Sequence, residues 1–260
     1  MGTVEHHQTT FDSWLATDRG RDVFHRQRKL ILDLVTPLQG ESVLEIGCGA
    51  GHFLKIFQDQ KCVVTGIDSS EDNLRQARKR LGDSAELIKG ACDDLPFSDN
   101  EFDIVTIIYE LGAASNPDQL LAEAIRVSHR RVFIGFLNYF SFAGTHHSFK
   151  KLFGLPLTRP IRCFNVFDMK SRVERFIKTP SLQWGSVIFF PGRFYDWFSD
   201  MENAVPRRNN PFGAFMGMVF PVKYVLRTVQ SPVLEQFDFK VKTRPVTPEP
   251  IRNMARRGNQ

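Results

Sequence analysis

The stretch VLEIGCGAGHF, residues 43–53, decides the fold of this chain. Its apolar beginning predicts a short buried strand over residues 42–46, and three glycines at alternate positions follow directly. Glycine permits backbone dihedrals that a Cβ forbids, and it lets a ligand approach the main chain closely. A strand that runs into a glycine turn and then a helix is typical of α/β proteins that bind a nucleoside cofactor.

Two details separate this turn from the dinucleotide-binding fingerprint. The pattern is G-x-G-x-G, and His52 stands where the third glycine of G-x-G-x-x-G belongs. Glu45 closes the strand just before the turn. A carboxylate at this point disfavours a pyrophosphate and favours a cofactor with a cationic amino-acid part. No Gly-Lys-Ser/Thr follows the glycines, which excludes a P-loop.

Predicted strands and helices alternate around this turn. The pattern predicts an α/β fold, a doubly wound Rossmann-like sheet of about seven strands, with a helical or irregular insertion after the fifth strand. The predicted strands are residues 42–46, 62–68, 86–88, 102–109, 131–137, 184–190 and 212–220. The predicted helices are residues 20–36, about 52–60, 71–81, 117–128 and 193–201.

The same pattern divides the chain into five segments. We expect an N-terminal helical cap over residues 1–40, a cofactor-binding core over 41–138, an insertion that covers the substrate over 139–182, the last strands of the sheet over 183–222, and an extension with a basic tail over 223–260. The end of this extension, with Pro245, Pro248 and Pro250 followed by the basic Arg252, Arg256 and Arg257, is typical of a mobile terminus.

The second predicted strand ends in an acidic residue. Asp68 lies 21 residues beyond Gly47. An acid at this position and distance suits a bidentate hydrogen bond to the two hydroxyls of a ribose. The alternative role is that of an aspartate that caps the helix predicted to begin at Glu71.

Together these motifs resemble the class I S-adenosylmethionine-dependent methyltransferases, most of all the small-molecule branch that includes the quinone-biosynthesis enzymes. The resemblance covers roughly residues 10–138. It rests on Glu45–Gly51, Gly66–Ser69, Asp94–Phe97 and Asn100–Asp103, and an opening motif, F-D-x-W-L-x-T-x-x-G over Phe11–Gly20, is similar to some uncharacterised members.

The resemblance implies S-adenosylmethionine as cofactor, S-adenosylhomocysteine as product, and a role for each matched residue. The glycine turn would contact the methionine part, Glu45 would anchor its ammonium group, and Asp68 would bind the ribose. The segment Cys92–Leu95 would flank the adenine, and Tyr109 would face the sulfonium. The implied cofactor-binding residues are Glu45, Gly47, Cys48, Gly49, Gly51, Asp68, Ser69, Cys92, Asp93, Leu95 and Tyr109.

Two departures from the family pattern stand out. Many relatives carry an acid directly after the glycine that corresponds to Gly90, to receive the adenine amino group, whereas this chain has Ala91. Asp93 is the candidate substitute. Ser128–Arg131 also replaces a Pro-Gly-Gly turn that commonly precedes the fifth strand.

The C-terminal part, residues 139–260, bears on the methyl acceptor. It holds 19 lysine and arginine residues against eight aspartate and glutamate residues, and 16 of the 24 phenylalanines. The aromatic insertion favours a small hydrophobic or aromatic metabolite as acceptor. The alternatives are an RNA or protein methyltransferase that uses the basic part, and a non-catalytic S-adenosylmethionine-binding protein. The candidate lining residues are Phe140, Phe142, Phe149, Phe153, Phe164 and Phe167.

The pattern assigns no catalytic residue, because placing an acceptor in line with a sulfonium requires no obligatory base. Tyr109, Glu110, His146 and His147 are the candidates if a base is needed.

Composition sets the remaining expectations. Four cysteines without a C-x-x-C pair or interleaved histidines predict neither a disulfide framework nor a metal site. The polar residues 1–30 carry no apolar signal segment, and no uninterrupted apolar span predicts a membrane helix, so we expect a cytoplasmic protein. Nucleic acid is the less favoured partner, Arg252–Arg257 leave a peripheral membrane contact open, and the oligomeric state is not encoded in any pattern we recognise.

Overall fold

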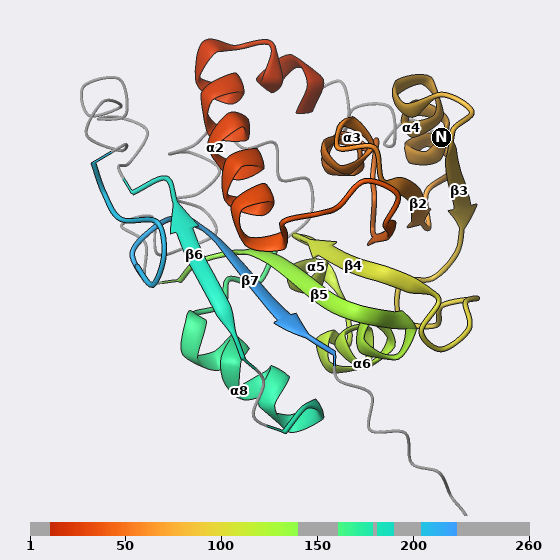
Figure 1. Ribbon diagram of the computed structural model, residues 1–260. Helices are drawn as coiled ribbons and strands as arrows, with labels where there is room; N and C mark the ends of the chain where they lie inside the picture. The colour runs from red at the N-terminus through yellow and green to blue at the C-terminus, as the bar shows by residue number, and fades with distance from the viewer. Residues whose placement is uncertain (1–10, 140–160, 179–180, 190–203, 223–260) are drawn as a thin grey trace, which may run out of the picture. The chain divides into compact units, whose positions relative to one another are not determined.

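The computed structural model describes residues 11–139, 161–178, 181–189 and 204–222, in which helices and strands alternate (Figure 1). The helices are α2 (Asp18–Val35), α3 (His52–Asp59), α4 (Glu71–Leu81), α5 (Glu110–Ala113), α6 (Pro117–Val127) and α8 (Val166–Phe176). The strands are β1 (Ser42–Ile46), β2 (Val63–Asp68), β3 (Ala85–Lys89), β4 (Phe102–Ile108), β5 (Ser128–Leu137), β6 (Gln183–Val187) and β7 (Phe215–Pro221).

All seven strands form one sheet, in the order β3-β2-β1-β4-β5-β7-β6. The first five are parallel to one another, and β7 is antiparallel to both β5 and β6. The predicted doubly wound α/β sheet of about seven strands is therefore confirmed. The strand order reverses at β1 and β4, and in such sheets ligands bind at the carboxyl ends of the strands beside this reversal.

Helices cover the sheet on both faces, with α2, α3 and α4 on one side and α5, α6 and α8 on the other (Figure 1). The strands alternate accordingly. Val43 of β1 packs with the first group of helices, and its neighbour Leu44 packs with the second. Both side chains have no exposed surface, so each strand is buried on its two faces, as parallel strands usually are.

Capping side chains lie directly before the first residues of α4 and α6. The Ser70 hydroxyl accepts a hydrogen bond from the Asn73 amide at the start of α4, and the Asn116 side chain does the same for Gln119 at the start of α6. Pro117 takes the first position of α6, where its missing N–H costs nothing. These local caps explain why the predicted helix starts agree closely with the observed ones.

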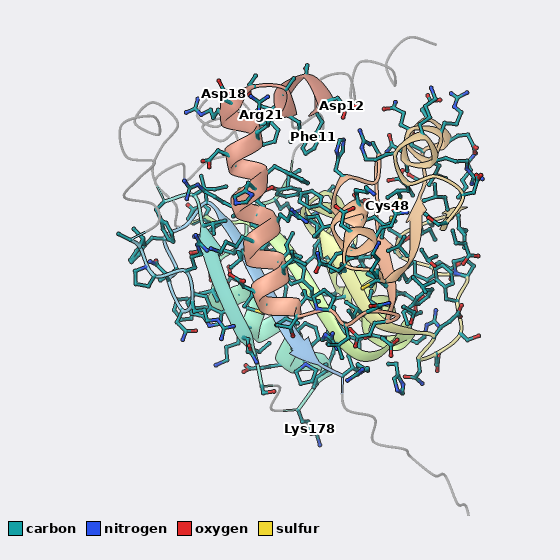
Figure 2. The ribbon with its side chains drawn as sticks, turned by 45° about the horizontal axis from the view of Figure 1, so that its top comes forward. Phe11, Asp12, Asp18, Arg21, Cys48 and Lys178 are labelled. Carbon is teal, nitrogen blue, oxygen red and sulfur yellow. The ribbon has the colours of Figure 1, made fainter. Side chains whose placement is uncertain are left out.

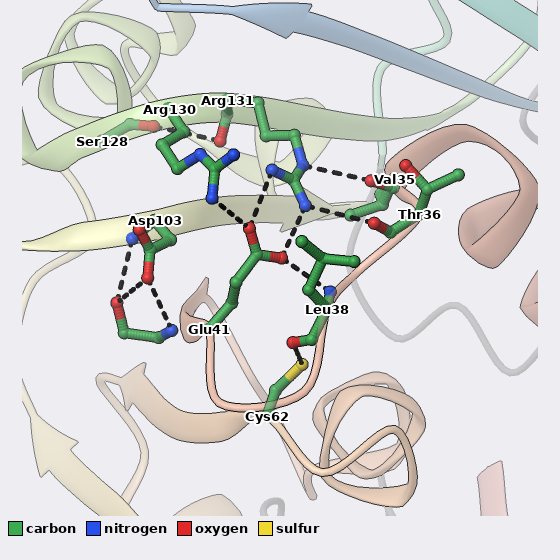
Figure 3. A network of polar contacts seen from close by, with 10 residues as sticks. Val35, Thr36, Leu38, Glu41, Cys62, Asp103, Ser128, Arg130 and Arg131 are labelled. Carbon is green, nitrogen blue, oxygen red and sulfur yellow. Dashed lines mark hydrogen bonds and ion pairs between the residues drawn. The ribbon is translucent and has the colours of Figure 1, made fainter.

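A buried carboxylate holds the end of the sheet that lies away from the glycine turn (Figure 3). Glu41, just before β1, pairs with Arg130 at 2.9 Å and with Arg131 at 2.7 Å. The Arg131 guanidinium also donates to the carbonyl oxygens of Val35 and Thr36 at the end of α2. This network ties α2, the start of β1 and β5 together.

The same region departs from the turn expected at Ser128–Arg131. These residues belong to β5, and Ser128 pairs directly with Phe102 of β4. The register shifts between Phe102 and Ile104, and the Ser128 hydroxyl donates to the Arg131 carbonyl across the irregularity. The strand thus begins at the residue after α6, with no intervening turn.

Several predictions fall outside the described residues: the helix at 193–201, the basic tail, the candidate histidines His146 and His147, and Phe140, Phe142, Phe149 and Phe153. Within the predicted insertion, α8 belongs to the layer that contains α6. No helix in the described ranges combines the length and the apolar character needed to cross a bilayer.

Candidate functional site

A cavity of about 200 Å³ lies where β1 and β4 end, beside the reversal of strand order. It brings together five of the predicted cofactor-binding residues, Glu45, Gly47, Cys48, Gly49 and Tyr109. Six other residues complete its lining: Phe11, Ala50, His52, Phe53, Ile108 and Glu110. The remaining predicted residues, Gly51, Asp68, Ser69, Cys92, Asp93 and Leu95, do not line this cavity.

A larger cavity, of about 580 Å³, lies at the opposite end of the sheet beside Arg130 and Arg131. It is lined by none of the motif residues, and the two arginines already pair with Glu41. The smaller cavity is therefore the candidate functional site, because position in the sheet and residue chemistry agree there.

The glycine turn directs its amide groups into the protein. The amides of Gly47 and Cys48 both donate to the carbonyl of Ile67, at 2.9 and 3.1 Å, and the Gly49 amide donates to Asp68 at 2.9 Å. A phosphate would need such amides as donors, as in the turns that bind phosphorylated nucleotides. With these donors engaged, the turn suits a ligand whose nearby group is a cation.

All three glycines of the turn have positive φ, but they face different surroundings. A Cβ on Gly47 would lie 2.6 Å from the Glu110 side chain, and one on Gly51 would lie 2.9 Å from Leu81 of α4. A Cβ on Gly49 would meet nothing within 4 Å. Gly47 and Gly51 therefore permit close packing, whereas Gly49 faces open space that a ligand can fill.

Glu45 is a buried carboxyl group with an unsatisfied oxygen. Its side chain is 1% exposed, and Oε2 has no hydrogen-bond partner within the described part of the chain. Burial raises the pKa of this carboxyl well above its ordinary value, and the nearby Asp68 raises it further, while a backbone hydrogen bond at Leu54 acts in the opposite direction. A cation placed in the cavity would satisfy the free oxygen and favour the ionised form.

Asp68 joins the glycine turn to α4. Its Oδ1 accepts hydrogen bonds from the Ser70 amide at 2.8 Å and from the Asn73 side chain at 3.0 Å, and its Oδ2 accepts the Gly49 amide. Ser70 is the N-cap of α4, so Asp68 supports the start of this helix without capping it. Each carboxylate oxygen has two lone pairs, so Oδ2 retains one acceptor position for a ligand hydroxyl. Ser69 beside it is exposed.

The segment predicted to flank the adenine is anchored from α6. The Leu95 amide donates to Glu123 at 3.0 Å, and Arg126 donates to the Leu95 carbonyl at 3.1 Å. Hydrogen bonding to Arg126 is also the main reason why the pKa of Glu123 is lowered. Leu95 is buried, while Cys92 is half-buried and Asp93 is exposed.

Tyr109 follows β4 in the left-handed region, with φ of 66°. Its hydroxyl accepts a hydrogen bond from the buried side chain of Gln27 in α2, at 2.6 Å. Its ring packs edge-on against Phe53 and Phe215, with centroids 5.8 and 5.5 Å away. Burial raises the pKa of the Tyr109 hydroxyl, so this side chain enters the site as a neutral aromatic wall. The positive φ marks a strained position of the kind that gathers at functional sites.

The Cys48 side chain fills space beside the cavity, and its thiol is not in the ionised form that acts as a nucleophile. Burial, followed by the charges of Glu45 and Asp68, raises the pKa of its thiol above the ordinary value. Gly66 makes room for it, because a Cβ there would lie 2.7 Å from the Cys48 sulfur. Within the described ranges no group of three or more histidine, cysteine or acidic side chains could hold a metal ion.

The sequence patterns missed part of the lining. Phe11 belongs to the opening motif, but no pattern connected that motif to the glycine turn. Of the phenylalanines proposed as lining, Phe164 is buried against Phe136 and Phe167 is exposed, and neither lines the cavity.

Comparisons of sequence place the glycine turn in a known domain. A family model described as a methyltransferase domain matches residues 43–130. The chain is 35% identical to the demethylmenaquinone methyltransferase of Renibacterium salmoninarum over 40% of its own length and 43% of that protein. It is 31% identical to an uncharacterized protein of Methanocaldococcus jannaschii over 58% of its own length and 69% of that protein. The chain thus spans less than half of the Renibacterium relative.

A comparison of structures agrees on the fold. The structure is similar to that of a SAM-dependent methyltransferase from Thermotoga maritima, with a TM-score of 0.65 and 18% sequence identity. The similarity covers 84% of this chain and 97% of that one. At this identity it establishes the shared arrangement of helices and strands.

Proposed function

The chain belongs to the class I S-adenosylmethionine-dependent methyltransferases, and we propose that it transfers the methyl group of this cofactor to a small hydrophobic or aromatic acceptor. Family membership supports the cofactor and the class of reaction. The lining of the cavity supports the acceptor class.

One observation carries the proposal: the buried Glu45 carboxyl lines the cavity with an oxygen that lacks a hydrogen-bond partner in the described part of the chain. The amides of Gly47, Cys48 and Gly49 donate within the protein. S-adenosylmethionine has an ammonium group and a sulfonium, and both are cations. A phosphorylated nucleotide would lack these three donors and would meet a carboxylate. The open space at Gly49 leaves room for the methionine part against the backbone.

The residues present divide the work of binding. Glu45 would accept the ammonium, the free position on Asp68 Oδ2 would accept a ribose hydroxyl, and the segment Cys92–Leu95 would flank the adenine. The rings of Phe53 and Tyr109 would exclude water and favour a neighbouring sulfonium through their negative faces. When bound, S-adenosylmethionine supplies an electrophilic methyl group that an aligned acceptor displaces.

The aromatic side of the cavity supports this acceptor class. Phe11, Phe53, Ile108 and Tyr109 give it an apolar wall, which suits a flat or apolar acceptor better than a charged one. The demethylmenaquinone methyltransferases among the relatives act on a quinone, by their names. We propose that residues 41–138 form the cofactor core and that residues 139–182 contribute to the acceptor side.

Calorimetry with S-adenosylmethionine and S-adenosylhomocysteine tests the cofactor first. We expect both to bind to the cavity and a nucleoside diphosphate not to bind. Transfer of a labelled methyl group to a panel of quinols and phenols then tests the acceptor class. Salt-sensitive retention of RNA together with label transfer to RNA would favour the RNA alternative, and cofactor binding without any transfer would favour the non-catalytic one.

A further inference from the structure

The opening motif folds into a turn that is held against the start of α2. Residues 11–15 form a helical turn, and the Thr17 hydroxyl donates to the Trp14 carbonyl at 2.6 Å while accepting the Gly20 amide at 3.0 Å. A Cβ on Gly20 would lie 1.9 Å from the Trp14 carbonyl oxygen, so only glycine allows this approach. Trp14 is buried. We call residues 11–17 the N-terminal turn.

The N-terminal turn carries Phe11 to the edge of the cofactor cavity. The Phe11 ring lines that cavity and packs on the His52 ring, with centroids 4.7 Å apart. His52 begins α3 directly after the glycine turn. Phe11 therefore closes one side of a cavity whose floor is made by residues more than 30 positions away in the sequence.

Asp12 fixes this arrangement from the next position. Its Oδ1 lies 2.7 Å from Arg80 of α4 and 3.0 Å from Nε2 of His52. Arg80 also donates to the Ala50 carbonyl in the glycine turn. Figure 2 shows Phe11 and Asp12 on the side of the N-terminal end of α2 that faces Cys48, with Asp18 and Arg21 on the other side. A single carboxylate thus links the N-terminal turn to α3, α4 and, through Arg80, the glycine turn.

The cation that pairs with Asp12 in this link is Arg80 and not His52. Burial and the neighbouring guanidinium lower the pKa of His52 to about 4, although Asp12 acts in the opposite direction, so the imidazole is neutral near pH 7. The Asp12 and Arg80 side chains are 45% and 25% exposed. Because a partly exposed ion pair contributes little free energy, this link can open on thermal fluctuation. It has the character of a latch.

We propose that the Asp12–Arg80 pair latches the N-terminal turn onto the glycine turn, so that Phe11 closes the cofactor cavity and sets how fast S-adenosylmethionine leaves it. This inference rests on the proposed function. Asp12 is a positioning residue that acts through Phe11, and Phe11 is the residue that touches the cofactor. Gly20 and Thr17 keep the turn in place from outside the cavity.

Stopped-flow measurement of cofactor binding to the full chain tests the latch. Asp12→Asn removes the ion pair, and we expect it to raise the dissociation rate constant of S-adenosylmethionine by up to about fivefold. Asp12→Glu should restore much of the slow rate. The control is Asp18→Asn, which removes the exposed ion pair with Arg21 at the start of α2 and should leave the rate unchanged.

A second variant perturbs the turn without touching the cavity. Gly20→Ala should displace the N-terminal turn and speed dissociation as Phe11→Ala does, although Gly20 does not line the cavity. Hydrogen exchange provides the readout besides rates: amides 11–17 should exchange more slowly when the cofactor binds the wild-type chain, and less so in Asp12→Asn.

The outcomes separate the two proposals. Unchanged dissociation and unchanged exchange in Asp12→Asn, in a wild-type chain that binds the cofactor, would overturn the latch and leave the proposed function intact. Failure of the wild-type chain to bind S-adenosylmethionine would overturn both. Faster dissociation in Asp12→Asn and in the folded Gly20→Ala variant, with Asp18→Asn unchanged, would support the latch.

Discussion

Replacing Glu45 by glutamine tests the physical basis of the proposed function. Glutamine keeps the shape of the side chain and one acceptor oxygen but cannot carry a charge. Hydrogen bonds to charged groups contribute about 1.5–3 kcal/mol, and charge assistance accounts for roughly half of their strength. The loss is therefore about 0.75–1.5 kcal/mol, or roughly three- to twelvefold in the Kd of S-adenosylmethionine.

The control is a ligand that has no ammonium group. 5′-Methylthioadenosine carries the adenosine and the sulfur but lacks the amino-acid part, so Glu45→Gln should leave its affinity unchanged. S-adenosylhomocysteine keeps the ammonium and should weaken as much as S-adenosylmethionine does. Isothermal titration calorimetry measures all three. Equal weakening of 5′-methylthioadenosine would show that the variant distorts the site, and unchanged binding of S-adenosylmethionine would refute the ammonium assignment.

Because the pKa of Glu45 is raised, we expect cofactor binding to be coupled to the loss of a proton from this carboxyl group. A cation in the cavity favours the carboxylate, so binding should release protons from the fraction of wild-type chains that are protonated there, and affinity should rise with pH up to the raised pKa. Calorimetry in two buffers of different ionisation enthalpy detects the release, which Glu45→Gln should abolish. In the unliganded chain, the stability linked to the neutral carboxyl is present below pH 4.5 and lost as pH rises through the raised pKa. The wild-type chain should therefore lose stability relative to Glu45→Gln on going from pH 5 to pH 8.

Three further variants test the structure around the site by urea unfolding. Gln27→Leu leaves the buried Tyr109 hydroxyl without its partner and should cost about 1–3 kcal/mol, part of which Tyr109→Phe should recover in the double variant; strict additivity would contradict the pairing. Gly51→Ala should destabilise the chain more than Gly82→Ala does, because both positions have positive φ but only Gly51 has Leu81 in the way; equal effects would remove the packing role. Glu41→Gln removes the charge of the buried carboxylate that pairs with the half-exposed Arg130 and with Arg131, and it should cost about 1.5–3 kcal/mol while the Kd of S-adenosylmethionine stays unchanged; a weaker Kd would couple the two ends of the sheet.

The sequence predicted the sheet and its helices closely because their signals are local. Ser70 and Gly82 bracket α4 by capping chemistry that acts within one helical turn. The apolar run before Gly47 likewise marks β1 whatever its neighbours are. Two strand starts were wrong by three residues: β5 begins at Ser128 and not at residue 131, and β7 begins at Phe215 and not at residue 212. The pairing of Ser128 with Phe102 depends on a neighbouring strand that no local pattern reveals.

The sequence could predict the part of the site that the glycine turn forms. Glu45, Gly47, Cys48 and Gly49 are neighbours in sequence, so a motif can show them together. Phe11 reaches the same cavity because the packing of α2 on the sheet places the N-terminal turn beside the start of α3. This placement is a property of the fold. Contacts of this kind have no signature at fixed spacing.

Asp68 shows why a motif can be right about position and incomplete about role. The pattern offered a ribose ligand or a helix cap as alternatives. The structure gives the cap of α4 to Ser70, which Asp68 supports through the Ser70 amide while it keeps an acceptor position on Oδ2. A carboxylate has four lone pairs, so the two roles need not compete. The hydrogen bond from the Gly49 amide also holds the turn in the shape that exposes its open face. The same side chain would thus shape the site and bind within it.

His52 connects the departure from the dinucleotide fingerprint to the shape of the site. In the dinucleotide fingerprint a glycine at this position lets the helix pack closely on the strand, but it would offer no ring to pack on Phe11 and no side-chain atom near Asp12. The amides of Gly47, Cys48 and Gly49 donate within the protein, so they are not presented to a pyrophosphate. A side chain at residue 52 is therefore free to support a cover over the cavity. Under the proposed function, the histidine that breaks the fingerprint and the Glu45 carboxylate near the end of β1 would act together, in a covered site for a cation and not an open one for a phosphate.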